Sequence, residues 1–388
     1  MRLSQRASGL EPSITLTLFA RARALAAEGR DIVNMAVGEP DFVAPTAVQA
    51  AAVAKVQSGD VRYTPAAGTP ALRRTIADYL GRTRGGSWSP EEVTVCHSAK
   101  HALSGSLLAL VQAGDEVLVP LPAWSSYFEL VRVTGATPVS VPPTAGCRPD
   151  LAALRAAVTP STRVVMMSSP CNPSGAVWNA DEIRALTDLA LEHDLTILCD
   201  EIYRALVYDG PAAVSPASIS DAARAHTVVV DGASKSLAMT GYRIGFLAGP
   251  REVATAVANL HGQTTGSPNA VSQAAYEAGL REDPPELEPM VATFAERRAV
   301  LVDGLRDLGL ETPDPAGAFY AFPDVSRFLD EHGSAGFCED LLESTGLALV
   351  PGSAFGMDGH VRLSYAVDEA VLRDALGRLG RFLEGRAH

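Results

Sequence analysis

The chain has 388 residues, 47% of them hydrophobic and 20% charged, which is the composition of a globular protein that can bury a large core, with a length that suits about two domains. Its net charge of −13, without a basic block at either end, argues against a nucleic-acid partner, because phosphate binding needs a cationic surface. The apolar runs are short and broken by glycine, proline or charge, and none follows the first residues as in a secretory signal, so we expect no membrane partner.

The cysteines indicate the cellular compartment, and the lysines indicate candidate catalytic residues. The chain has five cysteines, an odd number without a C-x-x-C pair, which suits the reducing cytoplasm better than a disulfide framework. Its 32 basic residues include only three lysines, Lys55, Lys100 and Lys235. A lysine kept in such a chain is a candidate for chemistry that arginine cannot perform, because only lysine can lose its proton and attack a carbonyl group. Lys55 lies in an alanine-rich stretch and is interpreted as a helix-surface residue, whereas the other two lie in turns beside apolar runs.

Short apolar runs alternate with polar turns and helical patterns through the middle of the chain. In chain order the runs are Val93–Cys96, Glu116–Val119, Val164–Ser168, Leu195–Cys199 and Thr227–Val230. Uniformly apolar strands that alternate with helices predict a mostly parallel sheet with helices on both faces. Ligands bind at the carboxyl ends of such strands, which is where the polar turns lie. The sequence therefore predicts a site along this edge of the sheet.

The pattern changes near the pair Pro284 and Pro285, which precedes a long helical stretch, Glu286–Leu308. We interpret the chain as a large domain over residues 46–283 and a smaller α+β domain over 284–388, with the N-terminal segment 1–45 packed on the latter.

The turn that holds Lys235 is the most informative segment. Lys235 follows an apolar strand, and Arg243 lies eight residues further on, before another apolar strand. A lysine that is desolvated enough to be neutral can bind an aldehyde, and a nearby arginine can bind a phosphate on the same molecule. The alternative, two cations on a surface loop, is less consistent with the scarcity of lysine.

The segments around this lysine resemble the class I/II aminotransferases, which are fold-type I pyridoxal phosphate enzymes. The resemblance covers nearly the whole chain, and it is closest to the bacterial aspartate aminotransferase branch. It implies the α/β fold of that group and a homodimer. The motifs that carry it are Gly38–Phe42, Tyr63–Gly68, Asn172–Gly175, Asp200–Tyr203, Ser234–Lys235, Met239–Gly245, Gly317–Tyr320, Pro351–Gly352 and Val361–Tyr365.

The resemblance assigns cofactor-binding roles residue by residue. Lys235 would hold pyridoxal 5′-phosphate as a Schiff base, and Asp200 would pair with its pyridine nitrogen. Asn172 and Tyr203 would bind its phenolic oxygen, and Trp124 would stack on its ring. The phosphate would be bound by Ser98, Ala99, Lys100, Ser234 and Arg243, together with Tyr63 of the neighbouring subunit.

The substrate-binding residues follow from the same resemblance. Arg362 would bind the α-carboxylate by a bidentate pair beside Gly38, where a side chain would interfere, and Trp124 and Asn172 would complete the site. Lys100 matches a lysine that reaches the distal carboxylate of aspartate, which favours transfer from L-aspartate to 2-oxoglutarate. Prephenate is disfavoured, because Glu11 stands where relatives that accept it tend to carry lysine.

The sequence is compatible with other functions to different degrees. Another reaction on the same cofactor, such as β-elimination or a specialised biosynthetic transamination, would use the same lysine, aspartate and arginine and stays open. An effector-sensing module without catalysis is disfavoured, because the resemblance begins within the first dozen residues and leaves no room for a DNA-binding extension. His97 and His101 have a metal-pair spacing but lack a third ligand, so no metal is expected. Neither a G-x-G-x-x-G turn nor a serine-hydrolase motif is present.

Overall fold

The computed structural model describes residues 3–10, 14–281 and 284–386, and a seven-stranded sheet is its largest element. The strand order is β2-β8-β7-β6-β5-β3-β4. The strands are β2 (Val93–Cys96), β3 (Glu116–Pro120), β4 (Thr137–Val141), β5 (Thr162–Ser168), β6 (Thr196–Asp200), β7 (Thr227–Gly232) and β8 (Gly245–Ala248). Because β8 is antiparallel to both β2 and β7 while the other pairs are parallel, every strand except β8 points its carboxyl end to the same edge. The predicted mostly parallel sheet is confirmed.

Helices cover both faces of this sheet. Successive residues of a strand point to opposite faces, so a strand that is apolar throughout needs cover on both. Val164 and Met166 of β5 pack toward one set of helices, and Val165 and Met167 pack toward another. The first face is covered by α5 (Ala99–Leu110), α6 (Ser126–Thr134) and α11 (Arg251–Thr264). The second is covered by α3 (Thr46–Gln57), α4 (Pro70–Arg84), α8 (Ala180–Glu192) and α12 (Ala270–Arg281). Short helices complete this part: α7 (Leu151–Ala156), α9 (Asp221–Ala225) and α10 (Ala233–Ser236).

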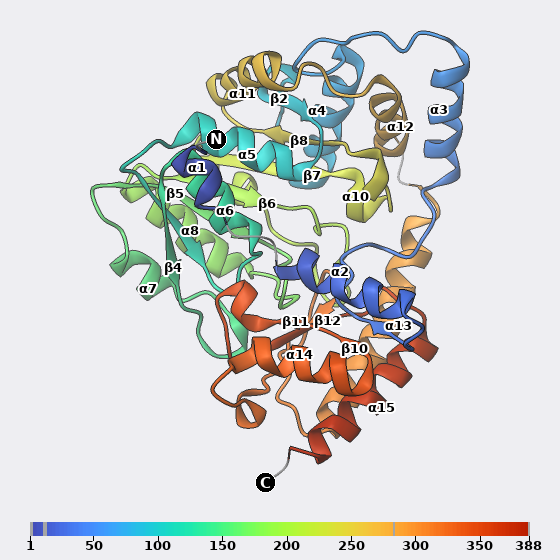
Figure 1. Cartoon of the computed structure of the whole chain (residues 1–388). Helices are drawn as coiled ribbons and strands as arrows, with labels where there is room; N and C mark the ends of the chain where they lie inside the picture. The colour runs from blue at the N-terminus through green and yellow to red at the C-terminus, as the bar shows by residue number, and fades with distance from the viewer. Residues whose placement is uncertain (1–2, 11–13, 282–283, 387–388) are drawn as a thin grey trace.

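A second apolar core contains Val33 and Met35 together with residues of the C-terminal elements. In it, β1 (Val33–Asn34) pairs in parallel with β10 (Leu347–Ala348). A small antiparallel sheet of β11 (Val350–Pro351), β12 (Val361–Ser364) and β9 (Tyr320–Ala321) lies beside them. The helices here are α2 (Ile14–Ala27), α13 (Leu287–Asp307), α14 (Gly333–Thr345) and α15 (Glu369–Glu384). In Figure 1, α2 lies beside the C-terminal elements. The short α1 (Gln5–Ser8), near the N-terminus, is drawn apart from these helices in Figure 1.

Part of the N-terminal segment packs against the C-terminal helices. Val33 and Met35 belong to the same apolar cluster as residues of α13, α14 and α15. The predicted helix 286–308 is α13, whose bounds differ by one residue at each end. The division at 283/284 stays a proposal, and residues 282–283 lie outside the described part of the chain. Within the residues described, no helix is both long and apolar enough to cross a bilayer.

Candidate active site

A cavity of about 400 Å³ lies where the carboxyl edge of the large sheet faces the small sheet. Its lining contains every predicted site residue except Tyr63, which lies in the α3–α4 loop and is 98% exposed. The predicted residues in the lining are Gly38, Ser98, Ala99, Lys100, Trp124, Asn172, Asp200, Tyr203, Ser234, Lys235, Arg243 and Arg362. The fold therefore brings together segments that are more than 300 residues apart in the chain.

Lys235 lies on α10, the single helical turn that follows β7. Its Nζ donates a hydrogen bond to the carbonyl oxygen of Gly38 and lies 5.7 Å from the ring centroid of Phe319. Burial lowers the pKa of this amine to about 8, against the opposing effect of the Glu39 carboxylate. An amine with such a pKa is available in its neutral, nucleophilic form near neutral pH.

Asp200 is the last residue of β6 and is 3% exposed. Its Oδ2 accepts a hydrogen bond of 2.7 Å from the Tyr127 hydroxyl, and its Oδ1 accepts one of 3.1 Å from the Ile202 backbone N–H. Burial raises the pKa of the carboxyl group to about 6, although both hydrogen bonds act in the opposite direction. A buried carboxylate of this kind is stabilised by a cationic partner, and no side chain among the described residues forms an ion pair with it.

Arg362, on β12, is a buried guanidinium 2% exposed. Its Nη1 donates to Asn172 Oδ1 and its Nη2 to the Ala36 carbonyl oxygen, both at 2.9 Å, while its Nε has no hydrogen-bond partner in the structure as described. The guanidinium carbon lies 4.4 Å from the ring centroid of Tyr320. Within the described residues no carboxylate neutralises this cation, so the cavity offers a binding site for an anion.

Two tyrosines adjoin that guanidinium. The hydroxyl groups of Tyr203 and Tyr320 are 2.8 Å apart, and both rings are buried. A Cβ atom on Gly38 would lie only 3.0 Å from the Tyr320 hydroxyl oxygen. Glycine at position 38 therefore lets the backbone pass close to this pair, and its predicted approach to the α-carboxylate stays a prediction.

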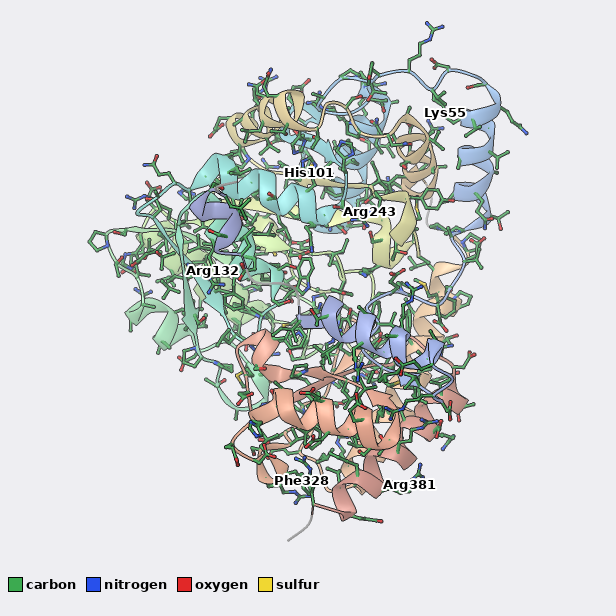
Figure 2. The ribbon with its side chains drawn as sticks, in the orientation of Figure 1. Lys55, His101, Arg132, Arg243, Phe328 and Arg381 are labelled. Atoms are coloured by element: carbon green, nitrogen blue, oxygen red, sulfur yellow. The ribbon has the colours of Figure 1, made fainter. Side chains whose placement is uncertain are left out.

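The start of α5 forms the opposite side of the cavity. Ser98 caps the helix, since its Oγ accepts the backbone N–H of His101 at 3.2 Å. A Cβ atom on Gly245 would lie 2.6 Å from the backbone nitrogen of Ala99, so a glycine is needed for β8 to pass this helix end. Ser234 is buried, and it lines the same cavity as Arg243, which is labelled in Figure 2, and the start of α5. A helix N-terminus with an arginine and a serine suits a phosphate.

Lys100 projects from that helix over the ring of Trp124, with 4.6 Å between Nζ and the ring centroid. Burial, and then the positive charge of Arg243, lower the pKa of its amine. The third lysine, Lys55, lies at the outer edge of the molecule on α3, where it pairs with Asp60 at 2.8 Å (Figure 2). The interpretation of Lys55 as a helix-surface residue is confirmed.

Seven residues of the lining were not predicted from the sequence, among them Tyr127, Glu39 and Tyr320. The last two stand inside motifs that were singled out, Gly38–Phe42 and Gly317–Tyr320. Glu39 accepts a hydrogen bond of 2.8 Å from the Thr240 hydroxyl. Tyr127 follows Trp124 at the start of a helical pattern, but its bond to Asp200 joins residues 73 positions apart, which no local pattern reveals.

His97 and His101, which have the spacing of a metal-binding pair, pack in a group of three histidine rings. The ring of His101 stacks on that of His261 at 3.9 Å between centroids and meets His97 edge to face at 5.3 Å. In the described part of the chain, no group of three or more histidine, cysteine or acidic residues is arranged to hold a metal ion.

These features fit the cofactor that the sequence predicted. An aldehyde needs a neutral amine, and Lys235 supplies one. A ring nitrogen that becomes cationic needs a buried carboxylate, and Asp200 lacks any other cationic partner within the described residues. A phosphate needs helix N–H groups and an arginine, which α5 and Arg243 offer. The donor set of the cavity therefore matches pyridoxal phosphate group by group.

Comparison with known proteins points to one family. The family described as aminotransferase class I and II matches residues 30–379. The aspartate aminotransferase of Geobacillus stearothermophilus is 38% identical over the full length of both chains, and the aspartate/prephenate aminotransferase of Thermus thermophilus is 42% identical over 99% of each. The structure of the Thermus thermophilus aspartate aminotransferase with maleate has a TM-score of 0.95 at 40% identity, covering 98% of this chain and all of that one. The Rhizobium meliloti aspartate aminotransferase has a TM-score of 0.95 at 37% identity over 99% of each chain. The chain belongs to the class I and II aminotransferases, enzymes of fold type I that depend on pyridoxal 5′-phosphate.

Proposed function

We propose that the protein transfers the α-amino group of L-aspartate to 2-oxoglutarate, with Lys235 as the residue that holds the cofactor. The observation that carries this proposal is the guanidinium of Arg362, which is buried, faces the same cavity as Lys235 and has no carboxylate partner within the described residues. A buried cation needs an anion, and an amino-acid carboxylate supplies one in a bidentate geometry.

Each residue of the cavity has its own role in the proposed reaction. Pyridoxal phosphate, when bound, supplies an aldehyde for the amino group and a cationic ring that takes up negative charge. Arg362 orients the α-carboxylate, and the Asn172 amide holds the guanidinium in place. Lys235 Nζ removes the proton from the substrate Cα as a general base. Asp200 keeps its negative charge next to the ring nitrogen, and its contact with Tyr127 favours that charged form.

Lys100 supports a dicarboxylic substrate. It places a second cation at the rim of the cavity, over the ring of Trp124. Two cations at different points of one cavity suit a substrate with two carboxylates. Relatives named as aspartate aminotransferases, and a neighbour whose structure contains the dicarboxylate maleate, support the same proposal. Some relatives are named as aspartate/prephenate aminotransferases; we propose that prephenate is not used here, although Glu11, on which this depends, lies outside the described residues.

The assembly and the location belong to the same proposal. We propose a homodimer in which Tyr63 reaches the phosphate of the neighbouring subunit, and its near-complete exposure agrees with a role away from its own cavity. All five cysteines are free and buried, which supports a reducing cytoplasmic location.

The direct test is spectroscopic. The purified protein, loaded with cofactor, should show a visible absorption band that disappears on addition of L-aspartate alone, with one oxaloacetate formed per site. Adding 2-oxoglutarate should restore the band. L-Alanine serves as the matched control, because it lacks the distal carboxylate. A band that ignores aspartate but responds to another amino acid would remove the substrate assignment and leave the cofactor in place.

A further inference from the structure

A buried ion cluster lies behind the cavity, on the opposite side of β6 from Asp200. Arg84, the last residue of α4, has a fully buried side chain. Its Nε contacts Glu201 Oε2 at 2.9 Å, and its Nη2 contacts Asp231 Oδ2 at 2.6 Å. The two carboxylates are 2% and 6% exposed, so all three charges are withdrawn from water. Such a cluster is costly to build unless each charge is paired.

The positions of the two carboxylates connect this cluster with the cavity. Glu201 directly follows Asp200, so the two side chains leave the strand in opposite directions. Asp231 lies on β7, four residues before Lys235. The strands β6 and β7 are neighbours, with Asp200 paired to Val230 and the Glu201 N–H bonded to the Val230 carbonyl oxygen at 2.8 Å. Arg84 therefore joins the ends of the two strands that present Asp200 and Lys235.

The charged and titratable side chains that face this cluster come from several elements. Arg204 Nε lies 3.7 Å from Glu201 Oε2, and the Cys199 thiol lies 3.6 Å from Glu201 Oε1. The ring of Tyr79 lies 5.1 Å from the Arg84 guanidinium, and the buried Tyr276 ring belongs to the same apolar cluster of α4 and α12. The two arginines balance Glu201 and Asp231, which leaves Asp200 with the unbalanced negative charge near the cavity. Tyr127 and Cys171 face Asp200 from the other side.

We propose that Arg84 is a positioning residue for the proposed transamination, which keeps Asp200 charged by neutralising Glu201 and Asp231 and holds the ends of β6 and β7 in register. Its guanidinium does not line the cavity, so it acts only through its two partners. The negative charges of Asp231 and Glu201 both act to raise the pKa of Asp200, after the larger effect of burial. Removing Arg84 leaves these charges uncompensated beside a carboxylate that has to stay ionised.

The test compares cofactor-loaded variants by the pH at which the visible absorption band of the bound cofactor changes. Arg84→Gln removes one positive charge, which stabilises the protonated, cationic form of the bound cofactor. The midpoint pH of the absorption change should therefore rise by about half to one pH unit, where one unit is a tenfold change in the ratio of the protonated to the deprotonated form. The rate of the aspartate half-reaction should fall roughly 10- to 100-fold, as for other residues that support a catalytic group, with little change in the aspartate concentration at half-saturation.

Two further variants separate charge from folding. Asp231→Asn removes a negative charge from the same cluster and should move the midpoint downward. Arg84→Gln combined with Asp231→Asn removes one charge of each sign from the cluster and should restore the wild-type midpoint. If Arg84→Gln does not fold, Asp231→Asn still decides, since a purely structural role leaves its midpoint unchanged.

The proposal is overturned if Arg84→Gln folds and titrates like the wild type at an unchanged rate, or if Asp231→Asn leaves the midpoint in place. Failure of the proposed function is a different result: the wild-type protein itself would show no band, or a band that does not respond to any amino acid.

Discussion

Arg362 Nη1 donates a hydrogen bond to Asn172 Oδ1 at 2.9 Å, across 190 residues of chain. The bond joins β12 of the small sheet to the turn after β5 of the large sheet. The substrate-binding guanidinium of the proposed function is therefore oriented by a residue from the other part of the molecule. Closing or opening the gap between the two sheets would change its geometry directly.

Arg362→Gln should reduce kcat/KM for L-aspartate by about 30- to 4,000-fold. Truncating one partner of a buried, hydrogen-bonded charge pair costs about 2–5 kcal/mol, and about 1.4 kcal/mol corresponds to tenfold. Steady-state kinetics give this value, and the absorption of the bound cofactor serves as the control, because it should be retained. A loss of less than tenfold would mean that the α-carboxylate binds elsewhere.

Lys235→Arg should abolish turnover almost as completely as Lys235→Ala, with a loss of about a thousandfold or more from the missing general base alone. A guanidinium stays protonated at every accessible pH, whereas the pKa of the Lys235 amine is lowered to about 8 by burial. Single-turnover oxaloacetate formation is the measurement. Ordinary transamination rates in either variant would remove Lys235 from the mechanism.

Tyr127→Phe should raise the pH at which the reaction rate falls on the acidic side of the pH–rate profile. The Tyr127 hydroxyl donates to Asp200 and lowers the pKa of a carboxyl group that burial raises to about 6. Without this bond the pKa rises further, so Asp200 becomes protonated, and loses function, at a higher pH. A hydrogen bond to a charged group contributes about 1.5–3 kcal/mol, so the acidic limb should move up by about one to two pH units. An unchanged limb, at equal cofactor content, would contradict the role of Tyr127.

Lys100→Met should lower kcat/KM for L-aspartate about tenfold, which corresponds to about 1.4 kcal/mol for a charge contact at a partly exposed site. The value for L-alanine should change by less than about threefold by the same scale. The backbone of residue 100 stays in place at the start of α5, so the cofactor content should not change. Equal losses for both substrates would assign Lys100 to the cofactor rather than to the distal carboxylate.

Gly38→Ala should weaken activity through one contact, because a Cβ atom there would lie 3.0 Å from the Tyr320 hydroxyl oxygen. Overpacking of this size costs about 1–3 kcal/mol. The double variant Gly38→Ala, Tyr320→Phe removes the clashing oxygen, so its loss should be smaller than the sum of the two single losses. A double-mutant cycle measures the difference. Strict additivity would show that the alanine acts through another contact.

Much of the fold and of the site could be predicted from local signals. The apolar runs predicted the parallel strands, and the polar turns after them predicted the edge at which the cavity lies. Ser98 before a helical pattern predicted the cap that the structure shows, with its Oγ on the His101 N–H. The scarcity of lysine identified Lys100 and Lys235, both of which line the cavity, and set apart Lys55, which does not.

The contacts that tune these groups could not be predicted in the same way. The bond from Tyr127 to Asp200, the pair of hydroxyl groups on Tyr203 and Tyr320, and the salt bridges of Arg84 each join residues 73 or more positions apart. The domain division and the partner of Tyr63 remain predictions.

The sequence by itself determined which chemical groups the protein carries and which strand ends present them, because strand and helix patterns depend on residues that are close in the chain. The tertiary structure alone decided which charges are buried, which of them face one another and which lack a partner. Desolvation and long-range contacts depend on packing between distant segments. They lower the pKa of the Lys235 amine to about 8 and leave Arg362 without a carboxylate partner among the described residues.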